Sequence, residues 1–298
     1  MNLKENKLFL ESVKTYKDFL TNNSLSDLNN NISDFEYFTY NHPESGNFYP
    51  KEDYSIVLLY SGGIDSYIAY YYAKSKYKNI KLIFVNYGQT YAKQEYDFIK
   101  NQDLDVEYVD ITSYTNIETP PTNNYGEIFP GRNWILATIA SDYINKRGEI
   151  WMVAIGGEVK EKWGDKSEYF FREGSKILSE RTNKNITITS PFKNKTKGQI
   201  VKWYLENGLD KNKLIDTVSC HDIDENNLPC GKCMGCAHRT VGFIYNNIFE
   251  NNFRNDILKT LINLYSREIN NEFSEFSEQR KKEISVTIER LQYLKEKW

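Results

Sequence analysis

The chain has 298 residues, of which 40% are hydrophobic and 27% charged, and this composition is typical of a globular protein with a sizeable core. Its formal net charge of −3 argues against a strong electrostatic footprint for duplex nucleic acid. The N-terminus lacks the apolar core of a signal peptide, and no apolar run approaches the ~18 residues of a membrane span. We therefore expect a cytoplasmic protein that does not bind a membrane.

Residues 1–52 are expected to form an N-terminal extension, because polar, turn-rich stretches interrupt any hydrophobic periodicity. From residue 53, short apolar runs typical of buried strands alternate with helical patterns. The expected strands are residues 55–60, 81–86, 106–111, 150–155 and 186–190, and the expected helices are residues 67–76, 91–101, 133–145 and 197–207. This alternation predicts an α/β domain over residues 53–215, with a parallel sheet covered by helices on both faces.

The rest of the chain divides into two shorter segments. Residues 216–243 hold all four cysteines and are expected to form a metal-binding segment. Residues 244–298 are expected to form a helical C-terminal extension, because apolar residues such as Ile257, Leu261 and Leu264 recur at a spacing of three or four. The predicted organisation is therefore an α/β core, a cysteine-bound knuckle and a helical tail.

A glycine loop, residues 61–66 with the sequence SGGIDS, follows the first expected strand and precedes a helix. The adjacent glycines Gly62 and Gly63 allow a close approach of ligand oxygens to main-chain N–H groups, and the helix N-terminus favours an anion. Ser61 and Ser66 add hydroxyl groups, whereas Asp65 suits a metal ion that bridges phosphates. The loop lacks the Gly-Lys-Ser/Thr ending of a Walker A motif. It predicts a phosphate site, with an ordinary serine-capped turn as the alternative.

The cysteines follow the pattern Cys220-x9-Cys230-x2-Cys233-x2-Cys236. Two x2 spacings form tight knuckles and the longer loop returns the first ligand, so the four thiolates are expected to hold one tetrahedral Zn²⁺ ion. Four protein ligands close the coordination sphere, which makes the metal structural; an iron–sulfur cluster is the alternative. His221 is expected beside the site, and Lys232, His238 and Arg239 are expected to offset the charge of the thiolates.

The glycine loop resembles the SGGxDS loop of the PP-loop ATP pyrophosphatases, which have an adenine-nucleotide α-hydrolase-like, Rossmann-like fold. Together with the cysteine segment, it resembles one branch of them, the QueC-like 7-cyano-7-deazaguanine synthases. Further matching motifs are Tyr87-Gly88-Gln89, Phe129-Pro130-Gly131-Arg132-Asn133, Thr196-Lys197-Gly198-Gln199-Ile200 and Thr217-Val218-Ser219-Cys220. The resemblance covers roughly residues 55–243, so the chain is interpreted as a divergent member with unusual extensions at both ends.

The resemblance implies ATP and Mg²⁺ as cofactors besides Zn²⁺, and it assigns roles to individual positions. It places cofactor binding at Ser61, Gly62, Gly63, Asp65, Ser66, Tyr87, Gly88 and Gln89. The catalytic residues would be Asp65, Arg132, which would contact substrate or phosphate, and Lys197, which would neutralise phosphate charge. The alternative interpretation of Arg132 is a surface ion pair. Without the resemblance, a solvated helix lysine would be the ordinary interpretation of Lys197.

The acceptor side of the family pattern is less well preserved. The family usually continues Tyr-Gly-Gln with Arg-His and later Glu-Leu, where this chain has Thr90, Tyr91, Gln94 and Glu95. Residues 156–167 lack the cysteine and arginine of the corresponding family loop. In that loop Asp165 could keep the family aspartate, and Trp163 could stack on a heterocycle. The nucleotide machinery therefore matches better than the acceptor pocket.

The leading hypothesis is ATP-dependent adenylation of the carboxylate of 7-carboxy-7-deazaguanine, a small-molecule substrate. Attack by ammonia would give an amide, and a second round would give the nitrile. The first alternative is a QueC-like enzyme of an antiviral defence system, which would join a 7-deazaguanine to a protein amine or another acceptor. Another is thiolation or other modification of tRNA, against which the acidic balance counts. From a different class, the chain could be a non-catalytic zinc-knuckle module that binds nucleic acid. A homodimer is left open.

Overall fold

The computed structural model describes residues 54–89, 91–113, 131–153, 167–224, 226, 228–269 and 278–297. The expected N-terminal extension, Phe129 and Pro130 of the arginine motif, Thr90, and the loop positions Trp163 and Asp165 lie outside the described residues. Within the described part of the chain, no helix is both long and apolar enough to cross a membrane.

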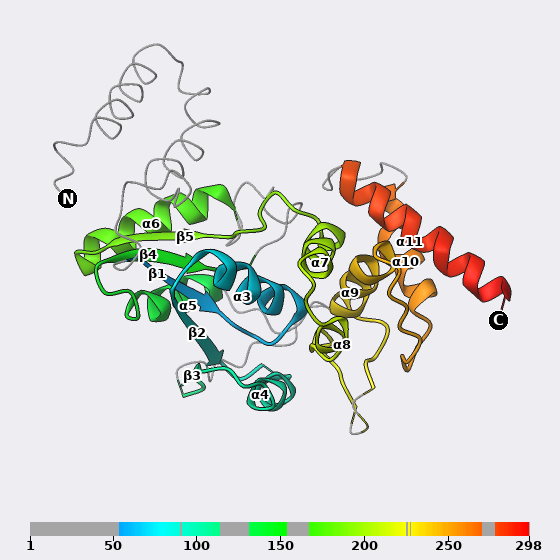
Figure 1. Cartoon of the computed structure of the whole chain (residues 1–298), viewed down its shortest axis with the longest axis horizontal. Helices are drawn as coiled ribbons and strands as arrows, with labels where there is room; N and C mark the ends of the chain where they lie inside the picture. Colours follow the sequence, from blue (N-terminus) through cyan, green and yellow to red (C-terminus); the bar gives the residue numbers. More distant parts are fainter. Residues whose placement is uncertain are drawn as a thin grey trace, which may run out of the picture.

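Five parallel strands form one sheet in the order β3-β2-β1-β4-β5 (Figure 1). The strands are β1 (Tyr54–Leu59), β2 (Asn79–Asn86), β3 (Val106–Asp110), β4 (Arg147–Trp151) and β5 (Asn185–Thr189). In register, Val57 of the central strand lies opposite Lys81 of β2 and Ile150 of β4. The strand order reverses direction between β1 and β4, and in such sheets ligands bind at the carboxyl ends of the strands beside this point.

Helices cover both faces of the sheet. The side chains of Ile56 and Leu58 pack on one face with the helices α3 (Ile64–Lys76), α4 (Ala92–Lys100) and α7 (Lys197–Glu206). Val57 faces the other side, where the helices α5 (Arg132–Ser141) and α6 (Glu168–Thr182) pack. All three of these strand residues are completely buried, as expected for a strand covered on both faces. The predicted α/β fold is therefore confirmed.

The C-terminal helices lie beside the sheet domain, next to α7 (Figure 1). They are α8 (Lys211–Ile215), α9 (Met234–Tyr245), α10 (Ile257–Ile269) and α11 (Glu278–Lys297). Val241 of α9, Leu261 and Tyr265 of α10 and Ile284 of α11 share one apolar cluster. The helical tail expected from the spacing of apolar residues thus packs as a small bundle on α9.

The main differences from the sequence-based expectation are the helices α6, α8 and α9, which were not among the expected helices, and β4, which ends at Trp151 where residue 155 was expected. Helix α9 also crosses the expected boundary between residues 243 and 244. Helix α6 was not predicted, because its buried face consists of Phe171, Leu178 and Gly174, a pattern too sparse to stand out among polar residues. A Cβ on Gly174 would lie 2.8 Å from Ile188 Cδ1, so the glycine allows α6 to approach β5 closely. Strand β4 begins at residue 147, three positions earlier than expected, because its first residues are polar or lack a side chain.

One of the first residues of β4 is Glu149, whose side chain is almost completely buried, with 1% of the residue exposed. Its carboxylate accepts hydrogen bonds from Tyr54 Oη at 2.6 Å and from Trp151 Nε1 at 2.5 Å. These partners explain how a charged residue type can occupy a buried strand position.

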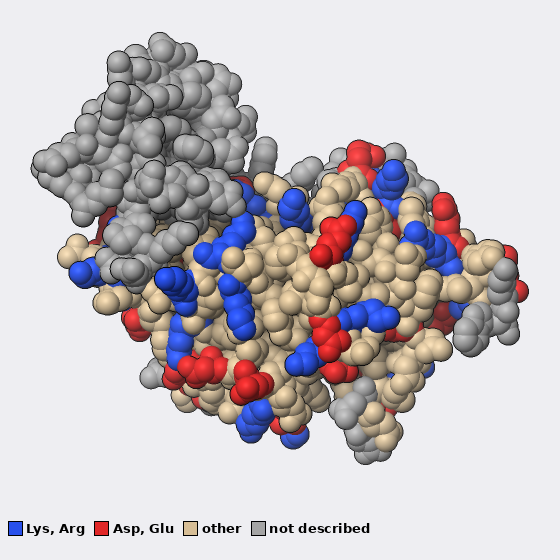
Figure 2. Space-filling model, in the orientation of Figure 1, with Lys and Arg blue, Asp and Glu red and all other residues tan. Residues whose placement is uncertain are grey.

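On the face of the molecule in Figure 2, acidic and basic side chains are interspersed.

Candidate active site and metal centre

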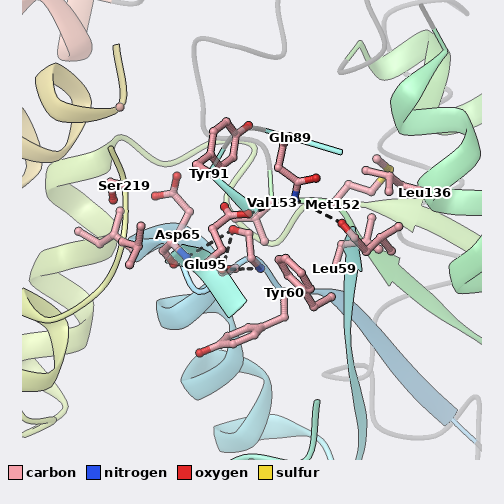
Figure 3. A pocket seen from close by; sticks show the side chains of 18 of the residues that line it. Leu59, Tyr60, Asp65, Gln89, Tyr91, Glu95, Leu136, Met152, Val153 and Ser219 are labelled. Atoms are coloured by element: carbon pink, nitrogen blue, oxygen red, sulfur yellow. Dashed lines mark hydrogen bonds between the residues drawn. The ribbon is translucent and has the colours of Figure 1, made fainter. Parts of the chain in front are cut away.

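A cavity of about 430 Å³ opens where β1, β2 and β4 end, between the sheet and the segment around residues 218–238. Asp65, Gln89, Glu95 and Ser219, which come from different elements, lie around it (Figure 3). Of the residues assigned from the sequence, the cavity is lined by Ser61, Gly63, Asp65, Ser66, Tyr87, Gln89, Arg132, Lys197 and Cys220. Gly62 and Gly88 are not among the lining residues, and both have a positive φ, so their contribution is to the course of the backbone.

The glycine loop connects β1 to α3 in a conformation that requires Gly62. This residue has φ = +71°, and a Cβ on it would lie 2.8 Å from Phe98 Cδ1. Gly63 is the N-cap of α3 and has no side chain to cover the first N–H groups of the helix. Ser66 Oγ donates to Gly63 O at 3.0 Å and accepts from Ser61 N at 3.3 Å, which braces the loop. The helix N-terminus is thus open to an oxyanion at the cavity.

Lys197 and Asp65 meet at this loop although they lie 132 positions apart in the sequence. Lys197 Nζ donates to both carboxylate oxygens of Asp65, at 2.5 Å to Oδ2. Lys197 is the first residue of α7, whose N-terminus carries a capping box between Thr196 and Gln199. The pair places one cation and one anion at the N-terminus of α3. A carboxylate in this position fits a divalent cation, and the ammonium fits a phosphate oxygen.

Glu95 is a cavity residue to which the sequence analysis gave no role. It is 8% exposed, and its Oε2 accepts a hydrogen bond from Gln89 Nε2 at 3.2 Å. Gln89 in turn accepts from Tyr87 N at 3.0 Å, so the Tyr-Gly-Gln turn orients it. Burial raises the pKa of Glu95 to about 8, while the hydrogen bond from Gln89 and the charge of Arg132 act in the opposite direction. Its spacing of four from buried Ile99 on an amphipathic helix could have revealed it.

Aromatic rings form a second part of the wall. The ring of Tyr91 stacks on His221 with centroids 4.8 Å apart and an interplanar angle of 19°. The guanidinium of Arg132 lies over the ring of Tyr87, 5.8 Å from its centroid. Burial also raises the pKa of Tyr91, which therefore stays a neutral phenol. Both ring systems offer flat surfaces beside the polar groups of the cavity.

The four cysteines converge on one point next to the cavity. Their sulfur atoms all lie within 4.8 Å of one another, with 3.9 Å between Cys230 and Cys236 and 3.5 Å between Cys233 and Cys236. Sulfurs bound at 2.3 Å to a tetrahedral ion would lie about 3.8 Å apart, so the arrangement fits such an ion. Cys220 Sγ accepts the N–H of Cys230 at 3.1 Å, and backbone N–H groups of this kind stabilise thiolates.

Two of the residues near the cysteines that were given an expected position or role are His221 and Arg239. The structure agrees with the first expectation and differs from the second. His221 lies beside the cluster, where it stacks on Tyr91, and is not one of the converging ligands. Arg239 was expected to offset the thiolate charge, and this expectation was wrong. Its guanidinium binds the carboxylate of Glu250 at 2.8 Å and Thr217 O at 2.8 Å, so the charge of Arg239 is paired with Glu250.

The segment before the cysteine cluster also supports the glycine loop. Val218 N donates to Gly62 O at 3.3 Å, and a Cβ on Gly63 would lie 3.2 Å from Val218 O. On the opposite side, a Cβ on Gly235 would lie 1.9 Å from Ser219 O, so α9 presses directly on the same segment. The residues just before Cys220 are therefore held between the cysteine knuckle and the loop.

Comparisons with known proteins show which chains this one is similar to. A model of the family described as "Queuosine biosynthesis protein QueC" matches residues 55–121 and 115–247, more than half of the chain. The 7-cyano-7-deazaguanine synthase of Marinobacter nauticus is 26% identical over 214 residues, which cover 65% of this chain and 94% of that protein. The proteins of the same name from Rickettsia felis and Methanocaldococcus jannaschii are 28% and 29% identical over 217 residues, covering 64% and 63% of this chain and 95% and 94% of theirs.

Proposed function

The chain belongs to the QueC family of queuosine biosynthesis proteins, and we propose on this basis that it is an ATP-dependent ligase that forms carbon–nitrogen bonds on a 7-deazaguanine. Its relatives named above are 7-cyano-7-deazaguanine synthases. The proposed acid substrate is therefore 7-carboxy-7-deazaguanine and the proposed amine is ammonia.

One observation carries this proposal. The glycine loop, Asp65, Arg132 and Lys197 line the same cavity although they come from separate parts of the chain. Together they supply an open helix N-terminus, a carboxylate for Mg²⁺ and two cations. Groups of these kinds bind the phosphates of a nucleoside triphosphate and its Mg²⁺ ion. The cavity also offers aromatic surfaces and Glu95 for a heterocyclic substrate.

In the proposed first step, a carboxylate oxygen of the substrate attacks the α-phosphorus of ATP and pyrophosphate leaves. Negative charge grows on the departing pyrophosphate, where the first N–H groups of α3 and the ammonium of Lys197 stabilise it. Asp65 would hold Mg²⁺, which supplies further charge neutralisation when bound. Arg132 would contact the substrate carboxylate or a phosphate oxygen.

In the second step, ammonia attacks the acyl carbon and AMP leaves with the electron pair of the C–O bond. Loss of a proton then gives the amide. A second round would adenylate the amide oxygen, and departure of AMP and two protons would give the nitrile. The chain's own contribution in both rounds is to hold the phosphates and the heterocycle in one cavity.

The test is release of pyrophosphate and AMP from ATP in the presence of Mg²⁺ and 7-carboxy-7-deazaguanine. Asp65→Ala should lower the rate by at least about 100-fold, because the metal carboxylate is lost. Asp97→Ala, an exposed acidic residue of α4, is the matched control and should keep the rate. Full turnover by Asp65→Ala would contradict the metal assignment. Absence of turnover by the unmodified protein would favour the nucleic-acid-binding module instead.

A second acceptor is favoured by the identity of two wall residues. Tyr91 and Glu95 line the cavity at positions where the family usually has histidine and leucine. An altered wall suits an amine on a larger molecule, such as a protein N-terminus, as in the antiviral defence alternative. Mass spectrometry of the product, formed with ammonia and separately with candidate proteins, distinguishes the two acceptors: the first predicts a free nitrile or amide and the second a protein conjugate.

A further inference from the structure

Helices α10 and α11 lie beyond the residues that match the family model, which end at residue 247. The inner face of α11 is unusual because it buries charged residues together with apolar ones. Glu283 is 2% exposed, and Arg280 and Lys281 are also buried. Charged side chains are rarely buried unless they bind a specific partner, so the contacts of this face indicate what the helix does.

Glu283 binds the N-terminus of α7. Thr196 Oγ1 donates a hydrogen bond to Glu283 Oε1, and the N–H of Gly198 also donates to this carboxylate. A Cβ on Gly198 would lie 2.5 Å from Glu283 Oε1, so the position must be a glycine for the carboxylate to come this close. A carboxylate at the first turn of a helix also interacts favourably with the helix dipole.

The two residues that bind Glu283 flank Lys197, whose ammonium binds Asp65 at the glycine loop. The stem of Lys197 lies against α9, because a Cβ on Gly242 would lie 2.4 Å from Lys197 Cγ. Lys197 and Glu283 also line one small cavity with His238 and Arg280, and Arg280 Nη2 lies 3.0 Å from His238 Nε2. The backbone of Lys197 is thus held by α11, its stem by α9 and its ammonium by the loop.

We propose that Glu283 is a positioning residue: through Thr196 and Gly198 it fixes the start of α7, and thereby holds Lys197 where it meets the phosphates of ATP. The C-terminal helix of this chain is then part of the nucleotide site although it does not line the main cavity. The inference rests on the proposed function in one respect, that Lys197 contacts ATP.

The test is a double-mutant cycle on the KM for ATP in the pyrophosphate-release assay. Glu283→Ala should raise this KM about tenfold, and Glu283→Gln, which keeps an acceptor oxygen, should stay within about twofold of the unmodified protein. In a Lys197→Ala background, Glu283→Ala should change the KM by less than about twofold, because it acts through the lysine. Glu289→Ala, an exposed position on the same helix, is the control.

A second readout does not need turnover. The rate at which an acylating reagent labels Lys197, followed by mass spectrometry, should rise severalfold in Glu283→Ala and stay unchanged in Glu289→Ala. If the unmodified protein neither binds nor turns over ATP, the proposed function fails, while the labelling still tests the position of Lys197. If Glu283→Ala does not fold, Glu283→Asp serves, since it withdraws the carboxylate by one methylene. The proposal would be overturned if Glu283→Ala raised the KM for ATP by the same factor in the unmodified protein and in the Lys197→Ala background. It would also be overturned if Glu283→Ala left the labelling rate of Lys197 unchanged.

Discussion

Glu95 combines burial with a position in the cavity wall, and this combination sets its titration. Its ordinary pKa is 4.5, and burial raises the pKa to about 8 in the folded protein. At a pH between these two pKa values, the Glu95 carboxyl keeps its proton in the folded protein and releases it in the unfolded chain. The contribution of this group to stability is therefore complete below pH 4.5 and is lost as the pH rises through about 8.

Replacement of Glu95 by glutamine removes this titration. Above pH 8 the Glu95→Gln variant should be more stable than the unmodified protein by roughly 3–5 kcal/mol, and near pH 5 the difference should be small. Urea unfolding at pH 5 and pH 9 measures both values. Glu206→Gln, an exposed glutamate of α7, should give the same small change at each pH. A Glu95→Gln effect that does not depend on pH would contradict the assignment.

At the level of elements, the glycine loop depends on a backbone conformation as well as on side chains. Gly62 and Gly208 have almost the same φ, +71° and +70°. A Cβ would crowd Phe98 at Gly62, whereas it would meet nothing within 4 Å at Gly208, which lies beyond the end of α7. A substitution at Gly208 therefore causes conformational strain alone, whereas a substitution at Gly62 causes strain and also crowds the loop.

Alanine substitutions at these two positions make a matched pair. Both should destabilise the protein by about 1 kcal/mol or more through the left-handed conformation. Gly62→Ala should in addition raise the KM for ATP at least about tenfold, because it displaces the open N–H groups of α3. Thermal unfolding and pyrophosphate-release kinetics measure the two effects. Equal changes in KM for both variants would show that the loop does not bind the nucleotide.

Across the whole molecule, the segment that leads to the cysteine knuckle is in direct contact with the glycine loop. The chain between Val218 and Cys220 contacts the loop on one side and α9 on the other. A metal ion held by all four sulfurs would link Cys220, at the end of this segment, to Cys230 and to the start of α9.

Metal removal should therefore weaken nucleotide binding from outside the cavity. We expect about one zinc ion per chain by elemental analysis. Chelation, or Cys230→Ser, should lower the unfolding temperature and reduce the affinity for ATP with Mg²⁺. Ser75→Ala, at an exposed position of α3, serves as the comparison for the cysteine variant. Iron with sulfide in place of zinc would contradict the proposed ion, and unchanged ATP affinity without metal would contradict the mechanical link.

Much of the α/β core could be predicted from the sequence. The strand, glycine loop and helix of residues 54–76 are encoded by apolar runs, a turn and a helix start that follow one another locally. The polar start of β4 and the sparse face of α6 could not be predicted in this way. Glu149 is acceptable in a strand only because Tyr54, 95 positions away, binds its carboxylate.

The sequence by itself determined the fold class, the family and the cysteine ligand pattern, because each of these rests on the spacing of neighbouring residues. Tertiary structure alone decided that Lys197 meets Asp65, that Glu95 faces the cavity and that Glu283 reaches the start of α7. These are pairings across 132 and 87 positions, or burial of charged groups. A charged residue looks solvent-exposed in a sequence until the fold supplies the distant partner that makes its burial stable.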